Sequence, residues 1–443
     1  MDQSRNARSE RLARPLTQAV LISPLKPSNL PILPLRVVIS GHEICGLIHD
    51  LEVELERRGH DVVTVAMSHR FFPYSYDYDQ HSFPISFMSR KFGLRPLWKK
   101  AFQALWEVNP DWHKSIDTRL RLGLVKGADV YIRVWGDLAC DNEVLQALNG
   151  SRTRVASLMM GSDIRDWDVF QQQYGISSWT FPPVYHAVTL EKKLQILRTH
   201  ERYADAIFSV PDQMGLALRP YHHLQVPLRL DMLTYNVPRR QVPRVVHAPS
   251  VPHVKGSDVI ERALETLRCE GVEFELISVR DVPHEKLLEI LTDADVLVDE
   301  LIAHGPGWLS FEAMASGCAV ATHYLEDSPE CFRPPVWSID EHNILSRLRT
   351  LLTDAALRID LAEKGRRYVE EHNTVQHVVD ELLRKVEMGR DASHDYVPGY
   401  LTTSYVPKNE AEAGVINAEN VSVAGEKWYR DNVAGKSHDG LVF

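Results

Sequence analysis

The stretch HGPGWLSFEAMASGCAV, residues 304–320, contains a glycine-flanked turn, one glutamate and a run of small apolar residues. DVLVD at 295–299 precedes it and CAVAT at 318–322 ends it, and both have the composition of buried strands. Leu309 to Ser316 can form a helix that Gly317 closes. The order strand, turn, helix, strand is typical of a parallel sheet covered by helices.

The same alternation extends outward from this stretch. Strands are predicted at 244–248 and 272–279, with helices at 257–271 and around 284–291, and three helical segments fill 342–388. An earlier series begins with a helical pattern from Ile44 to Leu55 that Gly59 ends, and its predicted strands are 35–40, 61–66, 128–134, 154–160 and 205–210.

The proline-rich segment NVPRRQVPR separates the two series. We therefore predict an α/β protein with two doubly wound Rossmann-like domains, 35–235 and 244–390, joined by a linker at 236–243. Ligands should bind in the central cleft, where the strands of both sheets end. Residues 1–34 are predicted to be a disordered leader, and 391–443 a polar tail whose KWYRDNV and LVF can dock on a domain surface.

Composition narrows the function classes. A net charge of -10 disfavours a nucleic-acid partner, which would require a broad basic face. The five cysteines are scattered without a C-x-x-C pair, so neither a disulfide framework nor a zinc site is expected. They fit a reducing cytoplasm, and no apolar run reaches the roughly 20 residues that span a bilayer.

The glycine turn suits an anion. The first N–H groups of a helix that starts at Trp308 and Leu309 are free and carry the positive end of its dipole, which favours a diphosphate. Glu312, one turn further, can accept hydrogen bonds from two vicinal hydroxyls of a ribose. The alternative is an ordinary capped helix with a solvated glutamate.

The loop APSVPHVKG, residues 248–256, adds a cation. It places Lys255 and Gly256 at the start of a helix, where an ammonium can neutralise a departing phosphate. A surface lysine is the alternative.

These segments resemble a known family. HAPSVPHVKGSDVIERAL, ADVLVDELIAHGPGWLSFEAMASGCAV and GRRYVEEHNTVQHVVDEL are similar to the donor-binding half of retaining GT-B glycosyltransferases of the family 4-like group. FEAMASGCAV carries the most specific similarity. The resemblance covers about 244–388 well and the first domain more loosely, through GHEICG at 41–46 and GSDIR at 161–165.

The resemblance implies roles for single residues. Glu312 matches the family's ribose-binding glutamate and Lys255 its diphosphate-binding lysine. Other implied donor contacts are Ser250, Gly256, Gly305, Gly307, Trp308, Leu309 and, in the first domain, Gly41. The turn of Gly161, Ser162 and Asp163 matches the part of the first domain that meets the reacting sugar.

Three positions depart from the family pattern. His304 stands where the family has the glutamate that holds the transferred sugar, Met160 where a histidine precedes the turn, and Pro249 where an arginine precedes the lysine. We hypothesise that Arg165 supplies the missing positive charge from across the cleft. The expected catalytic residues are Lys255, His304, Asp163 and Arg165.

The implied reaction moves a sugar from a nucleoside diphosphate sugar to a glycan, lipid-linked or small-molecule acceptor, with retention. Fixed cations and helix dipoles can stabilise the leaving diphosphate, so we expect neither a metal nor a cofactor. The D-x-D patterns at Asp77 and Asp79 and at Asp293 and Asp295 are interpreted as a loop and as turn residues.

The segment SRKFGLRPLWKKAFQALW, residues 89–106, interleaves basic and aromatic residues. It fits a helix lying on the anionic inner face of a membrane, which would favour a lipid-linked acceptor. An amphipathic helix packed on the core is the alternative.

Two rival functions remain. The three departures suit a catalytically inactive relative that binds a nucleotide sugar or a partner glycosyltransferase. An NAD-dependent oxidoreductase would share the fold class, but GHEICG lacks the G-x-G-x-x-G fingerprint.

Overall fold

A computed structural model describes residues 34–67, 119, 122–135, 141–161, 163–176, 181, 188–280, 282–324, 330–391 and 393–396. The predictions for residues 1–33, for Asp77 and Asp79, for the basic segment 89–106, for Ser162 and for the aromatic segments of the tail lie outside these residues.

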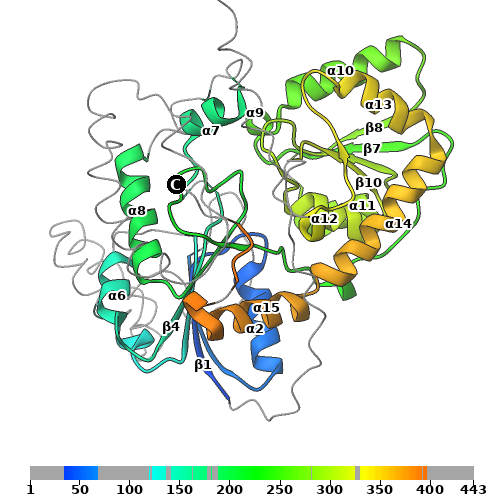
Figure 1. The fold of residues 1–443 in the computed structure, drawn as a ribbon. Helices are drawn as coiled ribbons and strands as arrows, with labels where there is room; N and C mark the ends of the chain where they lie inside the picture. Colours follow the sequence, from blue (N-terminus) through cyan, green and yellow to red (C-terminus); the bar gives the residue numbers. More distant parts are fainter. Residues whose placement is uncertain are drawn as a thin grey trace, which may run out of the picture.

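The first domain contains a six-stranded parallel sheet of order β2-β1-β3-β4-β5-β6 (Figure 1). Its strands are β1 (Arg36–His42), β2 (Asp61–Met67), β3 (Val130–Val134), β4 (Arg154–Leu158), β5 (Ala206–Ser209) and β6 (His222–His223). Its helices are α2 (Leu47–Arg57), α6 (Asp141–Leu148), α7 (Trp167–Tyr174) and α8 (Leu190–Tyr203).

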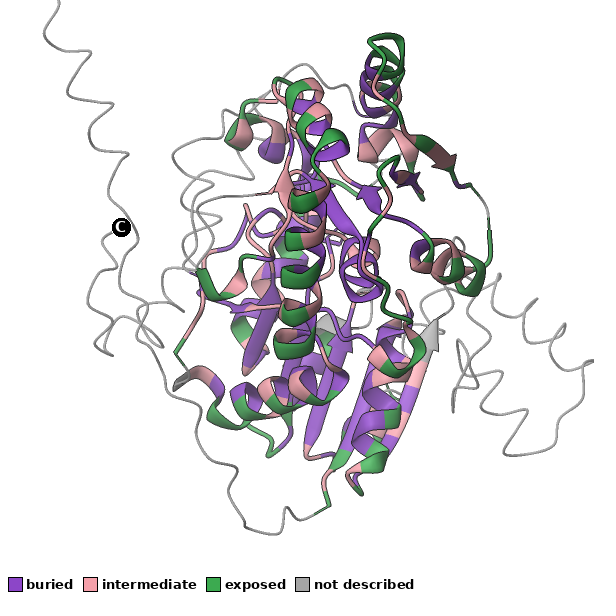
Figure 2. Cartoon of the chain, turned by 90° about the vertical axis from the view of Figure 1, so that its right-hand side faces the viewer, coloured by how far each residue is buried: buried purple, intermediate pink, exposed green. Residues whose placement is uncertain are grey.

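Burial on both faces explains the apolar strands. Val37 and Ile39 of β1 belong to one core cluster, whereas Val38 belongs to the cluster on the opposite face. On α2, Leu51 and Leu55 recur at helical spacing and are fully buried, which stabilises the fold by roughly 1.5–3 kcal/mol for each side chain. In Figure 2, most of the strand surface is purple, for buried residues, and the helices are green on their outer sides.

The second domain contains a five-stranded parallel sheet of order β11-β10-β9-β7-β8. Its strands are β7 (Arg244–His247), β8 (Glu275–Ser278), β9 (Val296–Val298), β10 (Ala319–Thr322) and β11 (Trp337–Ser338). Its helices are α9 (Pro252–Lys255), α10 (Ser257–Cys269), α11 (His284–Thr292), α12 (Trp308–Ser316), α13 (Ile344–Thr353) and α14 (Ala355–His372). The predicted strands are confirmed; β6 and β11 have two residues each and too little sequence to form a pattern.

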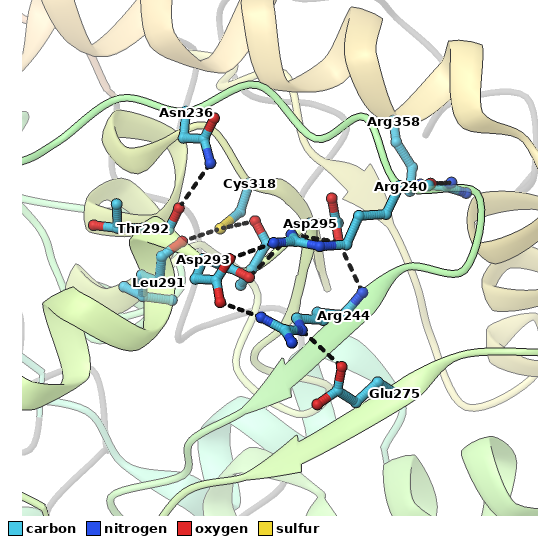
Figure 3. A network of polar contacts seen from close by, with 11 residues as sticks. Asn236, Arg240, Arg244, Glu275, Leu291, Thr292, Asp293, Asp295, Cys318 and Arg358 are labelled. Atoms are coloured by element: carbon cyan, nitrogen blue, oxygen red, sulfur yellow. Dashed lines mark hydrogen bonds and ion pairs between the residues drawn. The ribbon is translucent and has the colours of Figure 1, made fainter.

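The linker is tied to the second domain by a charged network (Figure 3). Arg240 donates to the buried Asp295 over 3.2 Å, and the backbone N–H of Arg244 donates to the same carboxylate over 2.8 Å. Both arginines also pair with Asp293. Arg358 donates to the carbonyl oxygen of Arg240 over 2.8 Å. The two aspartates that precede β9 therefore fix where the second domain begins.

The predicted end of the second domain, residue 390, is wrong. The last helix, α15 (Val375–Met388), returns to the first domain, where Val375, Val379, Leu382 and Val386 join the core beside β1. The helix packs on α2 and β4, and this packing removes its apolar stripe from water (Figure 1).

The beginning of the tail also packs on the first domain. Tyr396 is buried and forms an antiparallel bridge with Tyr221, while Asp395 forms an ion pair with Lys385. Residues 393–396 therefore belong to the folded body of the first domain.

Candidate functional site

The predicted site residues lie in loops that follow parallel strands. In the second domain, β7 leads into α9 and β9 leads into α12, and these two strands are neighbours in the sheet. In the first domain, β1 leads into α2 and β4 leads into α7. All four loops leave the carboxyl ends of their strands, where doubly wound sheets bind ligands.

Lys255 ends α9 and lies in a partly buried ion cluster. Its Nζ is 2.8 Å from Oδ1 of Asp299, and it also pairs with Glu300. The other oxygen of Asp299 accepts a hydrogen bond from Ser310 Oγ over 2.7 Å. Burial lowers the pKa of Lys255, but the two carboxylates more than offset this and raise the pKa, so the ammonium stays charged at neutral pH.

The start of α12 faces this ammonium. Gly307 is the N-cap residue, and no side chain caps the helix there. A Cβ atom on Gly307 would lie 3.2 Å from Lys255 Nζ and 3.0 Å from Glu300 Oε1. The structure therefore brings together the predicted cation, the glycine turn and the helix start at Trp308. The ammonium and the helix start each favour an anion, whereas Asp299 and Glu300 oppose one.

Glu312 is buried on the second turn of α12. Its Oε1 lies 2.7 Å from Nε2 of His284, at the start of α11, and this hydrogen bond raises the pKa of His284. Burial raises the pKa of Asp50 on α2 to about 7, and Glu312 adds to that increase. The ribose-binding candidate therefore faces the first domain.

His304 lies among aromatic rings of both domains. Its ring centroid is 4.2 Å from that of Tyr174, 5.1 Å from that of Phe170 and 4.0 Å from that of His323. Neither ring nitrogen has a hydrogen-bond partner among the described residues. Burial, His323 and Arg165 lower the pKa of His304 to about 3, so its imidazole is neutral at physiological pH.

Arg165 is held within the first domain. Its guanidinium donates to Asp212 over 2.5 Å and lies 4.9 Å above the ring of Trp167. Its charge still acts on the second domain: burial lowers the pKa of His304 and Arg165 adds to that decrease, whereas burial raises the pKa of Glu300 and Arg165 opposes that increase. The proposed replacement cation is therefore close to the second domain but already paired.

Asp163 shapes the turn that contains it. Its Oδ1 accepts hydrogen bonds from the N–H groups of Gly161, over 3.0 Å, and Met160, over 3.3 Å. Its Oδ2 is buried without a hydrogen-bond partner among the described residues. Burial raises its pKa to about 6, although Arg133 acts in the opposite direction.

Two predicted donor glycines have packing reasons to be glycine. Gly41 has φ +143°, and a Cβ there would lie 1.9 Å from the carbonyl oxygen of Val134. Gly256 has φ +72° and lies against Leu301. Of the neighbouring donor candidates, Ser250 is exposed, whereas Leu309 packs at the edge of the second core.

Apolar contacts join the two domains beside the site. Trp308 packs against core clusters of both domains. Ile302 and Val254 pack with Trp167 and Phe170 of α7, which Figure 1 places beside α9. Sequence patterns did not single out Asp299, Glu300, His284 or Asp50, because only the folding of separate loops gives these residues their partners.

The described residues contain neither a candidate metal site nor a candidate membrane span. No group of three or more histidine, cysteine, aspartate or glutamate side chains there could hold a metal ion. In the same part of the chain, no helix is both long and apolar enough to cross a bilayer.

Part of the second domain matches a known protein family. Residues 257–384 match the family described as "Glycosyl transferase-like". No curated protein matches the chain in sequence.

Two solved structures share the fold. One is a sucrose-phosphate synthase from Thermosynechococcus elongatus (TM-score 0.50, 14% identity, covering 80% of this chain and 98% of that one). The other is a trehalose-6-phosphate synthase (TM-score 0.50, 11% identity, covering 80% and 99%).

An alpha-glucosyltransferase in complex with UDP and a 13-mer DNA also matches (TM-score 0.49, 12% identity, covering 80% and 99%). The predicted exclusion of a nucleic-acid partner is not confirmed. Residues 257–384 therefore carry a glycosyl transferase-like domain, and the chain, with its two parallel sheets, has the GT-B fold.

Proposed function

We propose that the chain is an active glycosyltransferase that moves a sugar from a nucleoside diphosphate sugar to an acceptor, with retention. The observation that carries the proposal is the placement of Lys255 against the uncapped start of α12, with the buried Glu312 one turn further along that helix. These three features suit the diphosphate and the ribose of one nucleotide.

The charges support departure of a diphosphate. Negative charge grows on the leaving phosphate as the glycosidic bond breaks, and an ammonium and helix N–H groups fixed in place stabilise it without reorganising. This mechanism needs no metal ion. The side chain of Lys255 is 12% exposed and is held by Asp299, so its ammonium is already oriented before the donor arrives.

Glu312 is proposed to accept hydrogen bonds from the ribose hydroxyls. His284 engages Oε1, and Oε2 has no hydrogen-bond partner among the residues that the structure describes. The hydrogen bond from His284 holds the carboxylate in one orientation, which reduces the conformational entropy lost on binding.

The sugar and acceptor would lie between this site and the first domain. Asp163, Arg165 and His304 border that region, and His304 offers one donor and one acceptor because its imidazole is neutral. We propose a glycan, lipid-linked or small-molecule acceptor, and peripheral contact with the inner face of a membrane through residues 89–106. Retention rests on the family resemblance.

A catalytically inactive, nucleotide-binding relative is the second candidate. It is favoured by His304, Met160 and Pro249, which replace polar contacts of the family, and by the carboxylates that already neutralise Lys255. The matched family and the fold do not favour an oxidoreductase.

Calorimetry and a transfer assay test the proposal. Wild type and Glu312→Ala are titrated with UDP, GDP, ADP and CDP, and thermal unfolding checks folding. One nucleotide should bind wild type, and the variant should bind it about 10- to 100-fold more weakly, because a charge-assisted hydrogen bond is lost. The transfer assay uses the sugar donor that contains the nucleotide that binds. Release of the sugar from this donor would indicate an enzyme, and no release would indicate a binding protein. Equal affinity in both proteins would remove Glu312 from the site.

A further inference from the structure

A second carboxylate lies against the lysine of the proposed phosphate site. Lys255 pairs with Asp299, which matches its charge, and also with Glu300. One positive and two negative side chains give the cluster a net charge of −1 (+1 −1 −1). Arg165 of the first domain, whose charge acts on Glu300, is matched by Asp212. An arriving diphosphate would therefore meet a negative cluster.

The two carboxylates are held differently. The side chain of Asp299 is 1% exposed and has a second partner, Ser310. The side chain of Glu300 is 14% exposed, and within the described residues Lys255 is the one hydrogen-bond partner of its carboxylate. Glu300 can therefore leave the lysine at lower cost than Asp299 can.

The backbone of Glu300 is held in place by hydrogen bonds. Its backbone N–H donates to Oγ1 of Thr322 over 3.3 Å, and Oγ1 donates back to its carbonyl oxygen over 3.2 Å. The same carbonyl accepts the N–H of His323 over 2.7 Å. A rotation about the side-chain bonds would move the carboxylate and leave β9, β10 and the loop in place.

The carboxylate occupies the space that suits an anion. Its Oε1 lies 3.0 Å from the Cβ position of Gly307, directly before the uncapped start of α12. A helix start of this kind favours any negative group, whether from a side chain or a ligand.

We propose that Glu300 is an internal competitor of the donor: its carboxylate holds the diphosphate position at Lys255 and swings away when a nucleoside diphosphate binds. Asp299 and Ser310 keep the lysine in place during the exchange. The return of Glu300 to Lys255 would then help to release the nucleoside diphosphate product. The inference rests on the proposed function, because it assigns the diphosphate to this cluster.

The test compares binding by the full chain with and without the competing charge. Wild type, Glu300→Gln and the control Glu289→Gln are titrated with inorganic pyrophosphate, with UDP, GDP, ADP and CDP, and with the free nucleosides. Glu289 pairs with Lys286 on the exposed face of α11, so the control removes a carboxylate away from the site.

Glu300→Gln should lower the Kd for pyrophosphate and for the cognate nucleotide by about 10- to 100-fold, the range expected for one charge-assisted hydrogen bond. Nucleoside affinity and Glu289→Gln should match wild type. Glu300→Asp, which keeps the charge but shortens the side chain, should give a smaller decrease in Kd and serves if the glutamine variant unfolds.

Equal or weaker pyrophosphate binding by folded Glu300→Gln would overturn the inference and leave the donor site standing. A similar gain in nucleoside affinity would also overturn it, because the effect would not be directed at phosphate. If neither folded protein bound any diphosphate or pyrophosphate, the proposed function would fail together with the inference.

Discussion

Replacing Gly307 by alanine probes the place where the donor phosphate is proposed to bind. The added Cβ would lie 3.0 Å from Glu300 Oε1, 3.2 Å from Lys255 Nζ and 3.5 Å from Asp299 Oδ2. The methyl group would therefore cover the ammonium and the start of α12. A phosphate oxygen that needs both would lose at least one contact.

The size of the effect follows from that contact. A hydrogen bond to a charged group contributes about 1.5–3 kcal/mol, so Gly307→Ala should raise the Kd for the cognate nucleoside diphosphate about 10- to 100-fold. Stability should change by about 1 kcal/mol or less, because φ is −75° and the nearest atoms are the ends of movable side chains.

Calorimetry with wild type, Gly307→Ala and the control Gly123→Ala measures the binding loss, and thermal unfolding measures stability. A Cβ on Gly123 would meet nothing within 4 Å, so the control should match wild type. Nucleotide affinity within threefold of wild type in folded Gly307→Ala would refute the placement of the phosphate against this glycine.

The remaining predictions concern pH and packing. The pKa of Asp395 is depressed because its contact with His222, its ion pair with Lys385 and the hydrogen bond from the N–H of His223 outweigh burial. Its stabilisation is therefore present above about pH 4 and is lost in acid. Asp395→Asn should lower the unfolding midpoint at pH 7 and flatten the fall of that midpoint below pH 4. The hydrogen bond with Glu312 raises the pKa of His284, so the stabilisation by this residue is full below about pH 6.5 and is lost as pH rises further. The unfolding midpoint of His284→Ala should therefore lie below that of wild type at pH 6, and the difference should shrink by pH 9. Gly41→Ala should cost more than about 3 kcal/mol in denaturant unfolding, because its Cβ would lie 1.9 Å from a carbonyl oxygen of β3; a wild-type midpoint would contradict this.

The amino-acid sequence by itself determined the order of the main elements. Apolar runs such as Val37 to Ile39 and Val296 to Val298 are buried on both faces of the sheet. A strand buried on both faces needs consecutive apolar residues, which can be recognised in the sequence. The glycine turn before α12 and the lysine at the end of α9 are also local patterns. They were therefore found without knowledge of their partners.

Only the tertiary structure decided which charges meet. Glu300 follows Asp299 in sequence, but its pairing with Lys255 depends on the packing of β7 beside β9. The contact between Glu312 and His284 likewise joins two helices. Such contacts leave no periodic signal, since each residue is an ordinary surface type in its own segment.

The packing of α15 on the first domain was also decided by the tertiary structure. The apolar stripe of α15 predicts a buried helix face but does not state which domain covers it. The sequence thus determined the elements and their order, because burial and turn geometry act on neighbouring residues. The charge balance of the site and the path of the last helix depend on contacts between distant segments, which only the folded chain creates.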